Sequence, residues 1–256
     1  MSLFDIFRAK PKDETEDPKL DRSVARVGRL ASDKRAQSYD RIEAIQTLCT
    51  VGTADSAAAL LKRFSFYIDP SITDQDEKDI AFQGIIAAGE AAVEPIREFC
   101  VKAESFTWPM KMLQQLLEED AYIDELLVLL ERFDTDYAKN QEPKLQIIAA
   151  LEGKKREDVR VAVERFLDDF DERVRFNTVA TLFSQEEEVS SGALLHALAC
   201  EESVRVKNRI AEGMVSRGWR VSDELKESVA AALPAGYGLR DGVVQQHPSS
   251  AAAMRF

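Results

Sequence analysis

The sequence predicts an all-α fold, specifically a right-handed α-solenoid of about six helical hairpins stacked in chain order. Apolar residues return at helical spacing through most of the stretch from Leu20 to Leu233. Strand-like alternation of apolar and polar residues is nearly absent from that stretch. Two sequence markers also recur with a period of roughly thirty residues, which is the length of a repeated helical hairpin.

The first predicted element is a short helix that caps the first repeat, with one apolar face formed by Leu20, Val24, Val27 and Leu30. A helical hairpin follows, because residues 41–52 are apolar at helical spacing, Gly52 suits a helix end and a new helix begins a few residues later. The pattern returns at 77–88, where Gly89 ends the helix and residues 92–101 resume it. This recurrence indicates a repeat.

The first marker is a basic residue that is followed, three and six positions later, mostly by small or apolar residues. It occurs at Arg41, Lys78, Lys111, Lys144, Arg175 and Arg205, which lie 30 to 37 residues apart. The match is weaker at the third and sixth positions, where Gln114 and Asn208 are polar. The spacing predicts about six units.

The second marker is a phenylalanine in the second helix of each unit. Phe64, Phe99, Phe133 and Phe166 lie 33 to 35 residues apart. An irregular helical bundle is the alternative, but amphipathicity alone repeats every three or four residues. We therefore expect a repeat, with the phenylalanine rings buried between its layers.

These residues resemble the HEAT-type repeat, including the short form found in many bacterial proteins. The matches to a first HEAT helix are Asp171, Val174, Arg175, Thr178 and Leu182, and then Ser203, Val204, Arg205 and Ala211. The proline-bearing start of a second helix is matched by Val93, Glu94, Pro95 and Ile96. The resemblance covers residues 40–233, is faint at 110–117, and implies a fold without implying an activity.

Three regions are expected along the chain. Residues 1–19 form a mobile N-terminal arm with a short amphipathic segment, because residues 10–19 are mostly charged or proline. Residues 20–234 form the HEAT-like solenoid. Residues 235–256 form a C-terminal tail, in which Asp241-Gly242 turns a small hairpin and disorder begins at Gln245.

The composition restricts the function classes. The 34 basic and 46 acidic side chains give a formal charge of -12, which argues against a nucleic-acid partner. No apolar run is long enough to span a membrane, and the first ten residues lack the pattern of an export signal. Cys49, Cys100 and Cys200 are widely spaced in apolar segments, so we expect buried thiols and a cytoplasmic location.

No residue pattern predicts catalysis, a metal site or a cofactor. The two histidines, His196 and His247, have no neighbouring glutamate and no second histidine three or four positions away. Some HEAT-repeat enzymes bind iron through histidine-glutamate pairs, and this sequence has none. Glycine-rich phosphate loops and nucleophile elbows are also absent. Acidic clusters such as 118–125 and 168–172 are interpreted as solvated turns and helix starts.

Two candidate interaction sites remain. Glu98, Glu131 and Glu164 occupy similar positions in successive second helices, so in a solenoid they form a row along the concave groove, where they favour a basic ligand. The alternative is that they are ordinary exposed residues beside arginines. The other candidate is an apolar segment near the N-terminus, formed by Leu3, Phe4, Ile6 and Phe7. It is suited to docking on a protein partner or to resting on a membrane surface, and the alternative is that it packs on its own solenoid or frays.

The function that we predict is non-catalytic: a cytoplasmic scaffold or adaptor that holds a protein partner in the concave groove. The alternative from the enzyme class is a subunit of a HEAT-like bilin lyase, whose repeats the array resembles in period. A HEAT-like DNA glycosylase is disfavoured by the acidic charge, and a membrane-peripheral adaptor depends on residues 1–7.

Overall fold

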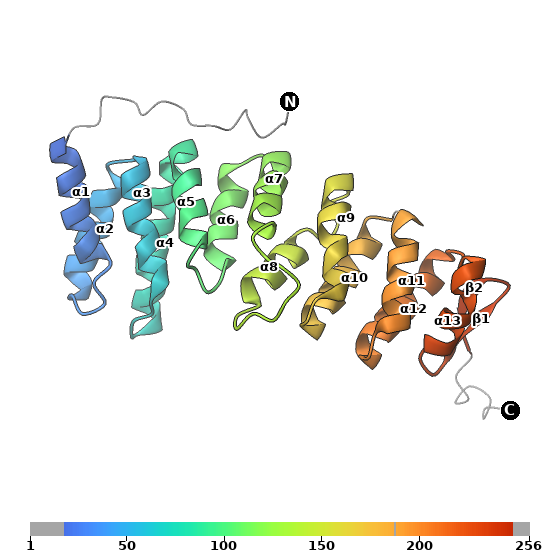
Figure 1. The fold of residues 1–256 in the computed structure, drawn as a ribbon. Helices are drawn as coiled ribbons and strands as arrows, with labels where there is room; N and C mark the ends of the chain where they lie inside the picture. The colour runs from blue at the N-terminus through green and yellow to red at the C-terminus, as the bar shows by residue number, and fades with distance from the viewer. Residues whose placement is uncertain (1–17, 187, 248–256) are drawn as a thin grey trace, which may run out of the picture. The chain divides into compact units, whose positions relative to one another are not determined.

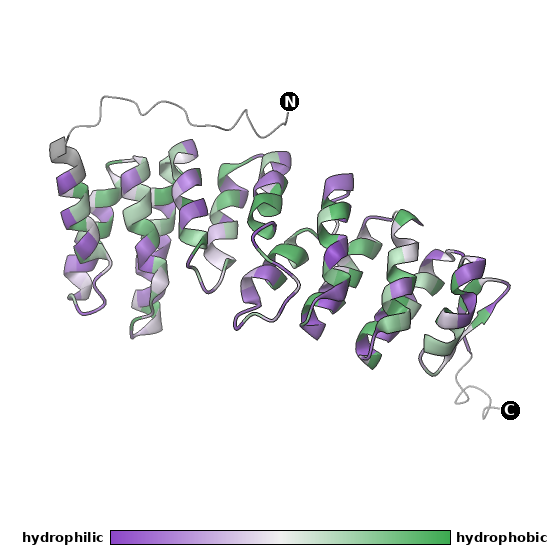
Figure 2. Ribbon diagram, viewed as in Figure 1, coloured by the Kyte–Doolittle hydropathy of each residue, from purple (hydrophilic) through white to green (hydrophobic). Residues whose placement is uncertain are grey.

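A computed structural model describes residues 18–186 and 188–247 and confirms the all-α class (Figure 1). These residues form thirteen α-helices, five short 3-10 helices and one two-stranded antiparallel sheet. Hydrophobic and hydrophilic residues occur together on most helices (Figure 2), as expected when one face of each helix is buried. The docking residues predicted between Leu3 and Phe7 lie outside the described residues.

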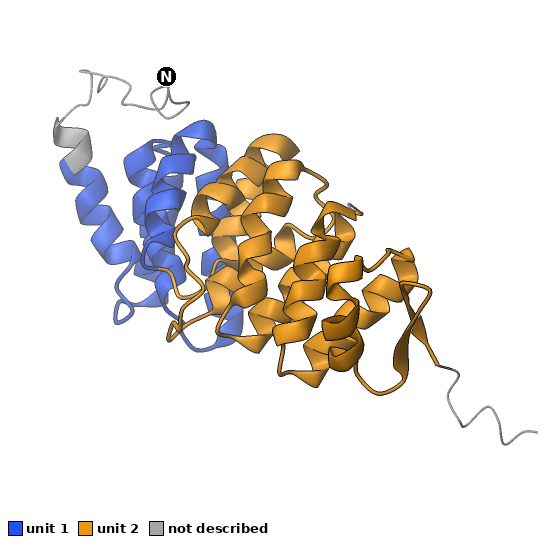
Figure 3. Cartoon of the chain, turned by 45° about the vertical axis from the view of Figure 1, so that its right-hand side comes forward, with its two compact units in different colours: residues 1–102 blue, residues 103–256 orange. Residues whose placement is uncertain are grey.

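The chain divides after Lys102 into two compact units (Figure 3). We expected one array over residues 20–234, so this division was not predicted. The faintest repeat match, at 110–117, lies just beyond the boundary. Each unit is described separately below.

Unit 1 contains α1 (Pro18–Ala31), α2 (Ser38–Cys49), α3 (Ala54–Leu61), η2 (Lys62–Ser65), α4 (Ser71–Ala87), η3 (Gly89–Ala92) and α5 (Val93–Cys100). Helix α3 contacts both α1 and α5, and α2 contacts α4, so a helix packs against the one two positions along the chain. The core includes Ile45, Leu60 and Ile85, which are buried. Gly52 and Gly89 have φ values of 65° and 60°, which confirms both predicted helix stops.

Unit 2 contains α6 (Thr107–Leu116), α7 (Glu119–Leu130), α8 (Glu142–Ala150), α9 (Glu157–Glu164), η4 (Arg165–Asp168), α10 (Glu172–Ser184), η5 (Glu188–Ser190), α11 (Ser191–Cys200), α12 (Val204–Arg217), η6 (Asp223–Leu225) and α13 (Lys226–Ala232). Helix α10 contacts α8 and α12, whereas α7 contacts α9, and α11 contacts η4 and α13. The alternation seen in unit 1 therefore recurs here.

The sheet pairs β1 (Tyr237–Arg240) with β2 (Val243–Gln246) around the predicted turn. Asp241 and Gly242 have φ values of 53° and 76°, and two consecutive positive φ values are typical of the tightest hairpin turns. The predicted hairpin is therefore confirmed.

Disorder from Gln245 onward was a wrong prediction for residues 245–247. Strand β2 continues to Gln246, and the His247 backbone N–H donates to the Gly236 carbonyl at 2.8 Å. The hairpin also packs on unit 2, because β2 contacts α12 and the Val221 N–H donates to the Gly242 carbonyl. These contacts order a segment whose polar sequence had suggested a free tail.

The recurring basic residue of the first marker anchors turns in both units. In unit 1, Arg41 donates to the Ala36 carbonyl and to the Glu77 carboxylate. In unit 2, Lys144 donates to the Asp134 carbonyl at 2.9 Å and to the carboxylate of Asp169. Each cation therefore reaches back to the preceding turn and forward to an acid 25 to 36 residues later. This arrangement explains why a basic residue recurs at this position.

Arg175 repeats the arrangement. Its guanidinium donates to the Asp169 carbonyl at 2.8 Å and to both carboxylate oxygens of Glu201.

The other three markers do not repeat it. Lys78 instead pairs with Asp74, four residues earlier in its own helix. Lys111 and Arg205 are exposed, in keeping with the weaker matches at the third and sixth positions.

The acidic cluster at 168–172, interpreted as solvated turns and helix starts, does contain a helix start at Asp171, but the interpretation was wrong for Asp169, which is not solvated. The Asp169 carboxylate is buried against Lys144, and Asp171 caps α10 by accepting from the Arg173 N–H at 2.8 Å. Burial is possible because a cation satisfies the charge.

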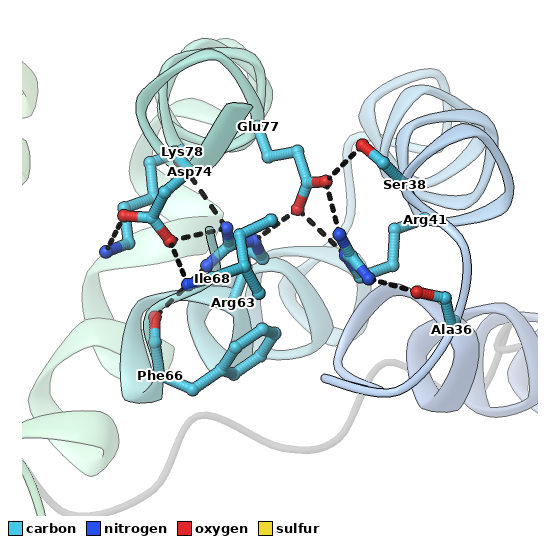
Figure 4. Close-up of polar contacts among 9 residues, drawn as sticks. All are labelled: Ala36, Ser38, Arg41, Arg63, Phe66, Ile68, Asp74, Glu77 and Lys78. Atoms are coloured by element: carbon cyan, nitrogen blue, oxygen red, sulfur yellow. Dashed lines mark hydrogen bonds and ion pairs between the residues drawn. The ribbon is translucent and has the colours of Figure 1, made fainter. Parts of the chain in front are cut away.

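Glu77 lies at the centre of a buried charge cluster in unit 1 (Figure 4). Its two carboxylate oxygens accept hydrogen bonds from Arg41, Arg63 and Ser38, at 2.7 to 3.0 Å. Because Arg41 comes from α2 and Arg63 from η2, this one carboxylate joins both elements to α4.

Asp74 occupies the other end of the same cluster (Figure 4). Its carboxylate accepts from Arg63 at 2.8 Å, from Lys78 at 2.7 Å and from the Ile68 backbone N–H at 3.1 Å. Burial alone would raise the pKa of Asp74, but these hydrogen bonds outweigh burial and hold the pKa below its ordinary value. The carboxylate therefore stays ionised in the interior.

The phenylalanine marker is buried as predicted only at Phe166, which has no exposed surface. Phe133, for which the same burial was expected, is only half-buried, as are Phe64 and Phe99. Phe133 lies beyond the end of α7 and meets the edge of Phe106 at 6.2 Å. Phe166 lies within η4 and Phe64 within η2, so a place in a 3-10 helix does not by itself decide burial.

Candidate functional site

A hollow of about 510 Å³ lies between α9, η4 and α11 of unit 2. It is lined by Val161 and Glu164 of α9, by Arg165, Leu167 and Asp168 of η4, and by Ala193, His196, Ala197 and Cys200 of α11. A smaller hollow of about 260 Å³ shares Leu167, Asp168, Ala197 and Cys200 with it. We call the two together the α9–α11 groove.

Helix α11 forms one wall of the groove because of its residue spacing. Ala193, His196, Ala197 and Cys200 follow the spacing that places residues on one helix face. Leu194 and Leu198 are fully buried on another face, so the leucines fix which face is turned outward. The two alanines leave space in which a ligand side chain can lie.

The opposite wall of the groove combines an exposed apolar side chain with a free carboxylate. Val161 is 57% exposed on α9. Asp168 is exposed and has no ion-pair partner within residues 18–186 and 188–247. By contrast, Glu164 accepts hydrogen bonds from Arg160 at 2.7 Å and from Ser190 at 3.1 Å. Among the described residues this wall therefore carries two charges without an ion-pair partner, Asp168 and the exposed Arg165, whose guanidinium donates to the Leu130 carbonyl.

The floor of the smaller hollow carries negative charge that is held in place. Burial would raise the pKa of Glu201, but hydrogen bonds from Arg175 and from backbone N–H groups lower it below the ordinary value. Glu202 adds an exposed carboxylate beside it. The groove therefore has apolar contact surface together with negative charge.

Of the three glutamates predicted to form a row, only Glu164 lines this groove. Glu131 is exposed just beyond α7 and is not part of the lining. Glu98 is exposed near the end of α5 in unit 1. Through Glu164 the sequence analysis pointed to one helix of this groove, α9, but it identified neither α11 nor Asp168.

The prediction that the cysteines are buried thiols was partly wrong. Cys100 is buried and Cys49 is half-buried, but Cys200 is exposed at the end of α11 and lines the groove. His196 is also exposed on this face. His196 and Cys200 are four residues apart and share a helix face that Leu194 and Leu198 do not. This spacing was the signal in the sequence that could have placed both side chains on the exposed face of α11.

Two general searches cover the described part of the chain. No three histidine, cysteine, aspartate or glutamate side chains in residues 18–186 and 188–247 are grouped so as to hold a metal ion. No described helix is both long enough and apolar enough to cross a bilayer.

Comparison of the chain with protein-family models, with curated proteins and with solved structures found no match.

Proposed function

We propose that this protein is a non-catalytic scaffold or adaptor that holds an extended segment of a protein partner in the α9–α11 groove. The observation that carries the proposal is the groove itself, where exposed Val161 and unpaired Asp168 face the small residues of α11. A surface that is apolar, hollow and rimmed by charge is typical of a binding site.

We further propose that the helices stack as a right-handed HEAT-like solenoid. The repeat markers and the contacts of each helix with the one two positions along support this arrangement. In such an array, neighbouring second helices form a continuous concave surface, so the α9–α11 groove is one segment of a longer binding face.

A cytoplasmic location is part of the same proposal. The three cysteines are all free, and a reducing compartment keeps thiols in that state.

The test is to fill the groove and follow capture of the partner. Ala197→Trp places a large ring between the two walls, whereas Ser216→Trp places the same ring on an exposed position of α12. Both variants and the wild-type chain are crosslinked in source cells, and crosslinked peptides are identified by mass spectrometry. We expect partner crosslinks to α9 and α11 in wild type and Ser216→Trp, and their loss in Ala197→Trp.

Thermal unfolding of each variant shows whether it remains folded. If folded Ala197→Trp captures the same partner as wild type, the groove is not the binding site.

A further inference from the structure

The described residues include four exposed aromatic side chains: one lies in the first turn of α2, and the other three lie in the turns that lead into α4, α8 and α10. They are Tyr39, Tyr67, Tyr137 and Phe170. Exposed rings are costly to leave in water and are enriched at binding sites. Their shared position raises the question of what they contact.

Two of these rings contact each other in unit 2. Tyr137 is 71% exposed and Phe170 is 66% exposed, yet their centroids are 5.3 Å apart and their planes meet at 81°. This edge-to-face geometry is a favoured aromatic contact. It joins the turn before α8 to the turn before α10 and leaves much of each ring facing solvent.

Buried groups hold the backbone under this pair. The Phe170 N–H donates to the Thr135 carbonyl at 2.8 Å, and the Phe170 carbonyl accepts from Arg175 at 3.1 Å. The neighbouring Asp169 is buried against Lys144. Because the turn is already fixed, little conformational entropy of its backbone is lost when a ligand binds the rings.

Other rings of this protein are covered by a cation of the same chain. Lys78 lies 3.8 Å from the centroid of Tyr67, and Arg205 lies 3.9 Å from that of Phe176. Arg165 lies over Phe166 and Arg63 over Phe66 in the same way.

The Tyr137–Phe170 pair has no such cation among the described residues. Two exposed carboxylates, Asp134 and Asp136, stand beside Tyr137 in the same turn, and the Asp134 carboxylate accepts from the Asp136 N–H at 3.1 Å. Open aromatic faces next to negative charge favour a cation.

We propose that the Tyr137–Phe170 pair is a docking surface for an arginine side chain of a protein partner. A guanidinium is planar, so it stacks on a ring while its N–H groups reach the nearby carboxylates, whereas an ammonium is compact and more strongly hydrated. Neither ring lines the α9–α11 groove, although Asp169 and Arg175 of its smaller hollow adjoin the Phe170 turn, and the proposal does not depend on the function proposed for the groove.

The probe is a short peptide of alternating arginine and serine, with a matched peptide in which citrulline replaces arginine. Citrulline keeps the shape of the side chain and removes its charge. Affinity is measured by calorimetry on the full chain at physiological ionic strength, which screens diffuse attraction to an acidic protein. The variants are Tyr137→Leu combined with Phe170→Leu, and Tyr39→Leu as the control that removes a different exposed ring.

We expect the double variant to bind the arginine peptide roughly fivefold more weakly than wild type, with Tyr39→Leu unchanged and the citrulline peptide weak throughout. Ring resonances of isotope-labelled Tyr137 and Phe170 in the wild-type chain provide a second measurement that does not depend on the variants folding. They should shift with the arginine peptide only. Equal affinity in the double variant, equal loss in Tyr39→Leu, undetectable binding to wild type, or equal ring shifts with both peptides would overturn the proposal.

Discussion

At the scale of single residues, Glu77 shows how buried charge stabilises unit 1. Its carboxylate is fully buried and accepts hydrogen bonds from two arginines and one serine. Removing one partner of such a group leaves the others desolvated and unpaired, which costs more than the pair itself contributes. The cluster is therefore sensitive to a change at its centre.

Glu77→Gln is expected to lower the free energy of unfolding by about 3 to 5 kcal/mol, because Arg41 stays buried without a carboxylate partner and Arg63 keeps only Asp74. Urea unfolding followed by circular dichroism measures the change. The matched control is Glu94→Gln in the exposed Arg97–Glu94 pair, for which we expect little change. A loss for Glu77→Gln no larger than for the control would mean that the cluster is solvated.

The same cluster predicts how stability depends on pH. For Asp74 and Glu77, burial would raise the pKa, but hydrogen bonds from Arg41, Arg63 and Lys78 outweigh it and lower the folded pKa below the ordinary values of 3.8 and 4.5. A carboxylate whose pKa is lower in the folded state than in the unfolded state stabilises the fold. This stabilisation is fully present above the pKa of the unfolded state, and it is lost as the pH falls through the pKa of the folded state.

Urea midpoints should therefore be level at neutral pH, begin to fall as the pH approaches the ordinary value of 4.5, and continue to fall below it. In Glu77→Gln the fall should be shallower, because one of the two carboxylates is gone. A wild-type protein whose urea midpoint stays level down to the lowest pH at which it is folded would contradict this mechanism.

The phenylalanine marker gives a second residue-scale prediction. Phe166→Ala should lower the free energy of unfolding by about 3 to 5 kcal/mol, because the ring is fully buried. Phe133→Ala should cost clearly less, since that ring is half-buried. Denaturant melts of both variants test the order, and an equal loss would show that the two rings are packed alike.

Sequence spacing predicted these residue positions but not their surroundings. A period of 33 to 35 residues placed all four phenylalanines in equivalent units, yet only Phe166 is fully buried. Likewise, the recurring cations were visible, but their acids were not assigned. Asp169 lies 25 residues from Lys144, and no local pattern shows which carboxylate of an acidic chain a buried cation will meet.

At the scale of elements, two helix glycines have opposite surroundings, and only one of them is needed for a contact between helices. A Cβ atom at Gly213 of α12 would lie 2.1 Å from the Phe183 ring of α10, whereas a Cβ atom at Gly192 of α11 meets nothing within 4 Å. The first glycine allows two helices to approach closely, and the second has no such role.

Gly213→Ala is therefore expected to lower the free energy of unfolding by about 1 to 3 kcal/mol despite the better helix propensity of alanine. Gly192→Ala should instead raise it by about 0.5 to 1 kcal/mol. The two variants carry the same chemical change, so thermal or urea unfolding separates packing from propensity. A stabilised Gly213→Ala would show that α10 and α12 are not in close contact.

Several elements could be predicted well because their signals are local. The glycine stops at Gly52 and Gly89 and the Asp241-Gly242 turn depend on backbone conformation at single positions, and all three are confirmed. The α9–α11 groove could not be predicted as a site, because its walls come from helices separated by a whole helix, α10. Glu164 alone connected the sequence to it.

At the scale of the whole molecule, the division into two compact units predicts that a substitution in the core of one unit destabilises that unit and not the other. Each unit has its own buried residues, so loss of protection should remain where the core is disrupted. Hydrogen–deuterium exchange of Glu77→Gln should show faster exchange within residues 18–102 and unchanged exchange within residues 103–247. Equal acceleration in both ranges would show that the chain unfolds as one cooperative body.

The exposure of Cys200 has a practical consequence. Burial raises the pKa of the Cys49 thiol and keeps it protonated, and Cys100 is buried, so a maleimide dye should attach first at Cys200. Because that thiol borders the groove, the dye's emission would report in real time whether a ligand occupies the groove of the otherwise unaltered chain. The molecule thus carries its own position for a fluorescent sensor.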